Sequence, residues 1–207
     1  LSKDFGISWD ESHHRDAGQR VLVYLVKFFG FDWVKPIPKG LESFDYSEKM
    51  YGPIFDTISA IIEESFQIKD FKNIYIMRHA LNFIFYFIGY FGYFYFIRLL
   101  FPKNNYALIL SFFYLLHPRL FAQGFFNPKD SILQAYFALS LIPIARTFLH
   151  FQFKDLIWSA MTIGIAISTK VVSIYLPFLF SFFYILIGHF KKININNIKK
   201  KNIAILF

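Results

Sequence analysis

Residues 80–101 read ALNFIFYFIGYFGYFYFIRLLF, an apolar segment in which Asn82 and Arg98 are the strongly polar side chains. A helix needs roughly 20 apolar residues to cross the hydrocarbon core of a bilayer, and this segment is long enough. The composition agrees, because 56% of the 207 residues are hydrophobic, 22% are aromatic and the mean hydropathy is +0.40. Soluble domains carry more charge and fewer aromatic residues. The sequence therefore predicts an integral membrane protein.

Further apolar segments follow the first one. Residues 106–126 are interrupted by His-Pro-Arg at 117–119, and residues 131–149 form the next predicted span. Residues 156–190 are too long for one helix and contain a single Lys, Lys170, near their middle. We expect two helices there, joined by a tight turn at STKVVS.

These segments predict an all-α, polytopic transmembrane bundle in two parts. Residues 1–79 are polar and mixed, and we expect them to form an extracytoplasmic loop. Residues 80–207 are expected to hold about five spans, and the closing NIAILF resembles the start of another. Because the chain begins at Leu1, we expect a piece of a longer protein whose missing part includes a preceding transmembrane helix. A cleaved signal peptide is the alternative.

The positive-inside rule orients the spans. If residues 1–79 lie outside, the inner connections contain a large share of the basic residues: Arg98, Lys103, Arg146, Lys154, Lys191, Lys192, Lys199, Lys200 and Lys201. The net charge is +8, but the basic residues lie between apolar segments rather than in one stripe with exposed aromatics. We therefore expect no nucleic acid partner. The absence of Cys excludes disulfide and thiolate chemistry.

Four cations run against this charge bias on the outer side: Arg78, Arg119, Lys129 and Lys170. A charged side chain at membrane depth faces a cavity, pairs with an anion or extends to the interface. Extension to the interface accounts for each cation taken singly. Gathered near Asp10, Glu11 and Asp130, they would instead hold a phosphate beside carboxylates that perform acid/base chemistry.

Two runs within the outer part have helical periodicity. Residues 16–29 place Val21, Leu22, Leu25, Phe28 and Phe29 on one face, and residues 53–66 do so with Ile54, Ile58, Ile61, Ile62 and Phe66. Both runs fit amphipathic juxtamembrane helices lying in the membrane interface. Packing against protein outside this chain is the alternative.

Five segments together carry a family resemblance: SWDESHH, YGPIFDTISAIIEES, MRHALNF, HPRLFAQGFFNPKDSILQAYFALSL and GIAISTKVVSIYLP. In this order they resemble the N-terminal part of the GT-C class of membrane glycosyltransferases, particularly protein O-mannosyltransferases and aminoarabinose transferases. The resemblance implies transfer of a sugar from a polyprenyl-phosphate donor to a lipid, glycan or protein acceptor on the non-cytoplasmic face. It also implies contact with membrane lipids and a place in a membrane such as the bacterial inner membrane. The acceptor stays undetermined.

The resemblance gives the site residues their expected roles. Asp10 matches the catalytic acidic position, so we expect it to be the general base, with Glu11 orienting it or helping to bind substrate. Asp130 is a further catalytic candidate, although its place at the start of a helix equally fits an N-terminal cap. Arg78, Arg119, Lys129 and Lys170 are the expected phosphate contacts.

Metal binding is a weaker hypothesis for the same segment. His13 and His14 beside Asp10 and Glu11 offer imidazole and carboxylate ligands, but adjacent histidines point apart and the spacing is not that of H-E-x-x-H. A structural zinc site and a divalent cation bridging carboxylate and lipid phosphate both stay open, and no cofactor is certain.

A transporter or lipid-binding protein without catalysis is the rival class. There the carboxylates would couple ions and the outer cations would bind an anionic substrate. An inverted repeat between the two halves would favour this class, and none is visible in the sequence.

Overall fold

The computed structural model describes residues 6–7, 10–30, 52–102, 105–150 and 152–191. All elements within these ranges are helical: α1 (Glu11–Phe29), α2 (Ile54–Ser65), α3 (Phe71–Leu100), α4 (Tyr106–Leu116), α5 (Pro118–Phe126), α6 (Pro128–His150), α7 (Phe153–Thr169), the 3-10 helix η2 (Val171–Ile174) and α8 (Tyr175–Lys191). The all-α prediction is confirmed for these ranges. The predicted start of another span, residues 202–207, lies outside them.

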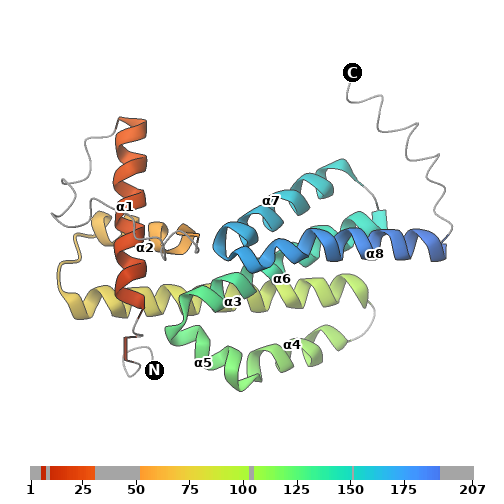
Figure 1. The fold of residues 1–207 in the computed structure, drawn as a ribbon. Coiled ribbons are helices and arrows are strands. Elements are labelled where there is room, and N and C mark those ends of the chain that lie inside the picture. Colours follow the sequence, from red (N-terminus) through yellow and green to blue (C-terminus); the bar gives the residue numbers. More distant parts are fainter. Residues whose placement is uncertain (1–5, 8–9, 31–51, 103–104, 151, 192–207) are drawn as a thin grey trace.

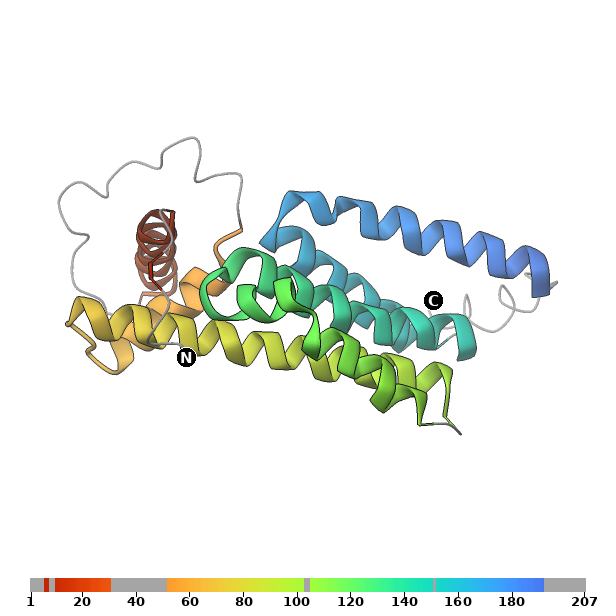
Figure 2. The ribbon, with the colours of Figure 1, turned by 90° about the horizontal axis from the view of Figure 1, so that it is seen from below.

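Helices α3 and α6 pack along each other and form the centre of the fold. Helices α4 and α5 lie against α3, whereas α7 packs on α6 on the other side (Figure 1). Helix α1 stands across one end of α3, and Figure 2 views α1 nearly along its own axis while α3 lies across the view. Helix α2 packs on α1 and also contacts α3 and α7, so it connects the crossing helix to the bundle.

Two of the described helices, α3 and α6, are long and apolar enough to cross a membrane. Shorter apolar stretches cover Tyr106–Leu116 and Val171–Phe182, so the predicted count of about five spans stays a prediction. Helix α3 begins at Phe71 because the Asp70 side chain accepts a hydrogen bond of 3.1 Å from the backbone N–H of Asn73. The helix therefore runs across the predicted boundary between residues 79 and 80.

The segment 106–126 forms two helices rather than one span. Pro118 is the first residue of α5, and its ring has no N–H with which to continue α4. The His117 ring accepts from the backbone N–H of Leu120 at 3.4 Å and caps the new helix. The turn predicted at STKVVS is confirmed, since α7 ends at Thr169 and extended Lys170 leads into η2.

Helices α1 and α2 form at the two predicted amphipathic runs, and their placement in a membrane interface stays a prediction. The burial of their apolar faces is uneven. Leu22 and Val26 of α1 pack with Ala60 of α2, whereas Phe28 and Phe29 are exposed. In α2 the polar face is buried and includes Asp56, Ser59 and Glu63. The predicted apolar face, which comprises Ile54, Ile58, Ile61, Ile62 and Phe66, is half-buried or exposed. Helix α2 thus presents apolar side chains outward, as a helix in a membrane interface would.

Helix α1 is fastened to α2 by a polar clamp and a close backbone approach. Arg15 donates to both carboxylate oxygens of Glu63, and the Gln19 amide donates to the same carboxylate at 3.0 Å. Gly18 lies against α2 so closely that a Cβ there would be 2.3 Å from the carbonyl oxygen of Asp56. The N-terminal half of α1 is therefore fixed relative to α2 and α3.

Candidate active site

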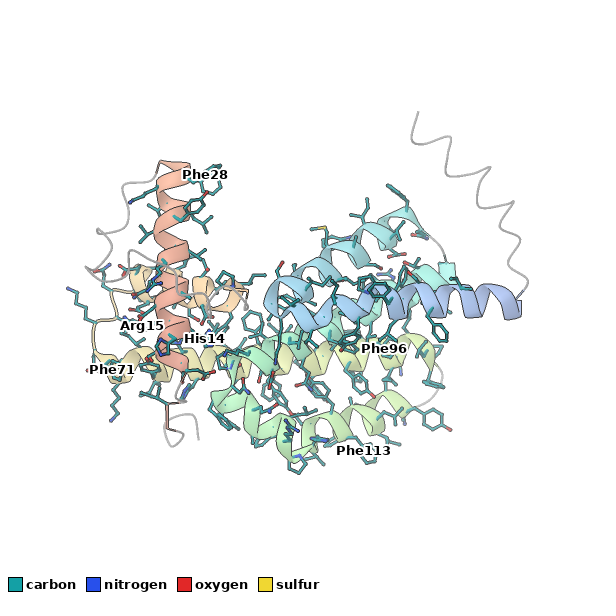
Figure 3. The ribbon with its side chains drawn as sticks, in the orientation of Figure 1. His14, Arg15, Phe28, Phe71, Phe96 and Phe113 are labelled. Atoms are coloured by element: carbon teal, nitrogen blue, oxygen red, sulfur yellow. The ribbon has the colours of Figure 1, made fainter. Side chains whose placement is uncertain are left out.

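A cavity of about 230 Å³ opens where three segments meet. They are the start of α1, the junction of α5 with α6, and the residue between α7 and η2. Its described lining residues are Asp10, His14, Phe126, Asn127, Pro128, Lys129, Asp130 and Lys170. Figure 3 shows His14 near the foot of α1, where α1 crosses α3, and Phe28 at its far end. The fold therefore joins predicted site residues from distant parts of the sequence.

Asp10 and Lys129 both line the cavity and form an ion pair with each other. Asp10 is the residue before α1, and Lys129 lies in the first turn of α6. The Lys129 ammonium donates to Asp10 Oδ2 at 2.7 Å, and both side chains keep some exposure, 19% and 28% respectively. This contact brings a predicted general base next to a predicted phosphate ligand.

Asp130 contacts Asn127, the residue that precedes α6, and a cavity lysine. Its backbone N–H donates to Asn127 Oδ1 at 3.3 Å, and the Asn127 amide donates back to Asp130 Oδ2 at 3.1 Å. This reciprocal pattern caps the start of α6. The Lys170 ammonium donates to the second oxygen, Oδ1, at 2.8 Å. Asn127 is thus the capping residue, and the Asp130 carboxylate holds the Asn127 amide with one oxygen and a cavity lysine with the other.

Glu11 lies below the cavity rather than in its lining. Only 1% of its surface is exposed, because it faces the start of α3. Its Oε2 is 3.2 Å from His79 Nε2, and its Oε1 is 3.7 Å from Arg78 Nε. Arg78, a predicted phosphate ligand, is equally buried and donates through Nη2 to Asp56 Oδ1 at 2.5 Å. These contacts hold the start of α1 against α3, and Arg78 also joins α3 to α2.

Asp56 and His14 complete a chain of titratable side chains between the cavity and Arg78. His14 Nε2 is 3.7 Å from Asp10 Oδ2, and His14 Nδ1 is 3.8 Å from Asp56 Oδ2. Burial raises the pKa of Asp56 from 3.8 to about 6, although the neighbouring Arg78 guanidinium opposes the shift. Burial, reinforced by the charge of Lys129, lowers the pKa of His14 from 6.5 to about 4. His14 is therefore neutral at pH 7.

The sequence did not single out Asp56 as part of the site. A signal was present, since Asp56, Ser59 and Glu63 recur at helical spacing within an otherwise apolar run. An acidic residue in such a run next to a membrane points to function or to a buried partner.

Two further predicted residues, besides Glu11 and Arg78, lie outside the described lining of the cavity. Arg119 is exposed on α5, outside the described lining of the cavity, and His13 is exposed on α1. Within the described ranges, no group of three or more His, Asp or Glu side chains is arranged to hold a metal ion. The metal hypothesis gains no support from this part of the chain.

Comparison with known proteins identifies a family relationship. Residues 58–207 match the family model described as dolichyl-phosphate-mannose-protein mannosyltransferase. No curated protein and no solved structure matches the chain significantly. Lys129, Asp130 and Lys170 fall inside the matched range, whereas Asp10, Glu11 and Asp56 precede it.

Proposed function

From the premise that this chain belongs to the dolichyl-phosphate-mannose-protein mannosyltransferase family, we propose that it transfers a sugar from a polyprenyl-phosphate donor to a hydroxyl of a lipid, glycan or protein acceptor. The family makes the chain a membrane glycosyltransferase of the GT-C type, and helices α3 and α6 agree with a membrane location. The donor, the acceptor and the side of the membrane belong to the proposal.

The observation that carries the proposal is the contact between Lys129 and Asp10 at 2.7 Å. Lys129 lies in the part of the chain that matches the family, and Asp10 lies outside it. The fold alone joins them, at a cavity that also holds Asp130 and Lys170. Carboxylates beside lysines are what glycosyl transfer from a lipid phosphate requires.

The reaction assigns each group a task. The acceptor oxygen forms a bond to the anomeric carbon of the sugar, and the bond from that carbon to the phosphate oxygen breaks. Polyprenyl phosphate leaves with the electron pair, and Lys129 and Lys170 stabilise its charge. Asp10 takes the proton of the acceptor hydroxyl. Glu11, held by His79 and Arg78, positions the start of α1 that carries Asp10.

The proposed site faces the non-cytoplasmic side of a multi-pass protein. The cavity lies at the end of the bundle where α3 and α6 begin, whereas Arg98 and Arg146 lie toward the other ends of these helices. An excess of basic residues marks the cytoplasmic side.

A transfer assay on the intact, membrane-inserted chain tests the proposal. We expect the intact chain in membranes to release lipid phosphate from dolichyl phosphate mannose, or from another member of a panel of polyprenyl-phosphate sugars, as measured by mass spectrometry. The Asp10→Asn variant should lose about 100-fold or more in turnover while still binding donor, because it keeps the shape but not the proton acceptor. Asp16→Asn, a carboxylate on the same helix outside the described cavity lining, is the matched control.

Two outcomes would contradict the proposal in different ways. Near-normal turnover by Asp10→Asn would remove the base assignment and direct the search to Asp130. Absence of transfer by the folded wild type with every lipid-linked sugar would favour a transporter instead.

A further inference from the structure

Both cavity lysines are paired with carboxylates that also face the cavity. Lys129 donates to Asp10, and Lys170 donates to Asp130 at 2.8 Å. The two pairs come from three different segments, and each retains between about a fifth and a third of its side-chain surface exposed. An anion that enters the cavity therefore meets ammonium groups already bound to carboxylates.

Resting on the proposed function, we propose that the donor phosphate displaces Asp10 from Lys129 and Asp130 from Lys170. The exchange transfers the lysines to the phosphate and frees Asp10 Oδ2 to take the acceptor proton. Asp10 thus becomes available as a base only when a donor is in place. The exchange therefore implies that the donor binds before the acceptor hydroxyl is deprotonated.

The energetics of the two kinds of contact favour the exchange. Ion pairs that remain partly exposed contribute little net stability, because water already screens the charges. A lysine bound to phosphate in a cavity keeps a charge-assisted hydrogen bond to an anion with more acceptor oxygens. The flexible four-carbon stem of lysine lets the ammonium move between acceptors.

The released carboxylates keep other stabilising surroundings. Asp10 precedes the first turn of α1 and Asp130 lies in the first turn of α6, where the positive end of the helix favours an anion. Asp130 also keeps its hydrogen bond from the Asn127 amide at 3.1 Å. Neither carboxylate is therefore left without a favourable partner when its lysine moves.

The affinity for dolichyl phosphate mannose tests the exchange. In the intact chain purified in detergent, we expect Asp10→Asn to bind the donor about threefold more tightly than wild type, since Lys129 no longer has to leave a carboxylate. Lys129→Ala should bind about tenfold more weakly. In the double variant, the gain from Asp10→Asn should disappear, because the lysine that produces it is gone.

The cycle separates exchange from general electrostatics. Removing any nearby negative charge helps an anion bind, but such a gain would persist in the Lys129→Ala background. Persistence there, or an unchanged affinity in Asp10→Asn, would overturn the exchange. Asp16→Asn removes a carboxylate from the same helix and should leave donor affinity unchanged. If Lys129→Ala does not give folded protein by size-exclusion chromatography, Lys129→Gln completes the same cycle.

The same measurements distinguish this inference from the proposed function. Wild-type protein that neither binds nor turns over any lipid-phosphate sugar contradicts the proposed function. Wild type that binds and transfers, with an Asp10→Asn variant that is inactive and unchanged in donor affinity, contradicts the exchange alone.

Discussion

Asp10 and Glu11 are adjacent in the sequence, yet they have different surroundings. Successive residues at the start of a helix point about 100° apart, so one faces the cavity while the other faces α3. Asp10 keeps 28% of its side-chain surface exposed, whereas Glu11 keeps 1%. A residue that exchanges protons with an acceptor needs access, and a residue that holds a helix in place needs burial. The division of roles between the two follows from this geometry.

Asp56 and His14 make opposite contributions to the dependence of stability on pH. The folded pKa of Asp56 is raised to about 6, so folded protein binds its proton more tightly, and stability from this group falls as pH rises from about 4 to 6. The folded pKa of His14 is lowered to about 4, so stability from this group rises between about pH 4 and 6.5. Each shift corresponds to on the order of 3 kcal/mol, and the two largely cancel.

We therefore expect the thermal unfolding temperature of wild type in detergent to change little between pH 4 and 6. Asp56→Asn should become more stable as pH rises over this interval, because the contribution of His14 is left alone. His14→Gln should become less stable, because the contribution of Asp56 is left alone. His13→Gln, which changes an exposed neighbour, should follow wild type. Parallel profiles for all four proteins would contradict these assignments.

At the scale of residues, the sequence indicated the charged side chains of the cavity but missed Asp56, which lies beneath them. Lys129 and Lys170 stood out because charges within apolar surroundings are costly, whereas Asp10 was singled out because it matches the catalytic acidic position of the resembled family. Their pairing across more than 100 residues, as for Asp10 and Lys129, depends on how helices cross and is not encoded in local pattern. The exposed position of Arg119 on α5 was equally beyond reach, because one basic residue looks like another until neighbouring elements are placed.

At the scale of elements, periodicity predicted α1 and α2, with their apolar faces expected in the membrane interface or against protein outside this chain. In a soluble domain the apolar face of such a helix faces the core. Next to lipid, the apolar face is equally well satisfied by the membrane, and polar side chains turn toward the protein. Asp56, Ser59 and Glu63 of α2 are buried while the isoleucines are largely outward, which is the arrangement that a helix in a membrane interface would have.

The crossing of α1 and α2 depends on Gly18. A Cβ at this position would be 2.3 Å from the Asp56 carbonyl oxygen and 2.4 Å from its carbon, so backbone has to move. We expect Gly18→Ala to destabilise the protein by about 1–3 kcal/mol. Transfer activity should also fall, because a shift of α1 would move Asp10, the residue that precedes this helix. Thermal unfolding in detergent and the lipid phosphate assay measure the two effects.

Gly164→Ala provides the matched comparison for Gly18→Ala. Gly164 also lies within a helix, and a Cβ there would meet no atom within 4 Å. Substitution should leave stability unchanged or raise it by about 0.5–1 kcal/mol. Equal effects of the two substitutions would mean that the close approach of α1 to α2 does not limit stability.

At the scale of the whole molecule, the chain alternates between two ends. Helices α3 and α6 begin near the cavity, and their 30 and 23 residues extend for about 45 Å and 35 Å. Helix α7 returns to the cavity at Lys170. A hydrocarbon core of about 30 Å fits between these ends. Arg98, Arg146 and Lys154 then lie on the side opposite the cavity, as the charge bias predicts.

Cysteine accessibility in sealed vesicles tests this arrangement, and the chain contains no native Cys to interfere. A membrane-impermeant maleimide should label Ser12→Cys from one side, and Asn105→Cys and Gln152→Cys from the other. All three parent residues are exposed, so label access depends on the side of the membrane. Labelling of Ser12→Cys and Asn105→Cys from the same side would contradict both the orientation and the position of the site.

Asn82 adds a consequence about spacing along α3. Its amide donates to the carbonyl oxygens of Gln123 and Gly124 at the end of α5, while His79, one turn earlier, contacts Glu11. Helix α3 therefore fixes the distance and the rotation between the α5–α6 junction, which carries Lys129, and the start of α1, which carries Asp10. One residue inserted between His79 and Asn82 would rotate these two side chains by about 100° relative to each other around the helix axis. The length of this single helical turn is thus as much a part of the site as the charges it spaces.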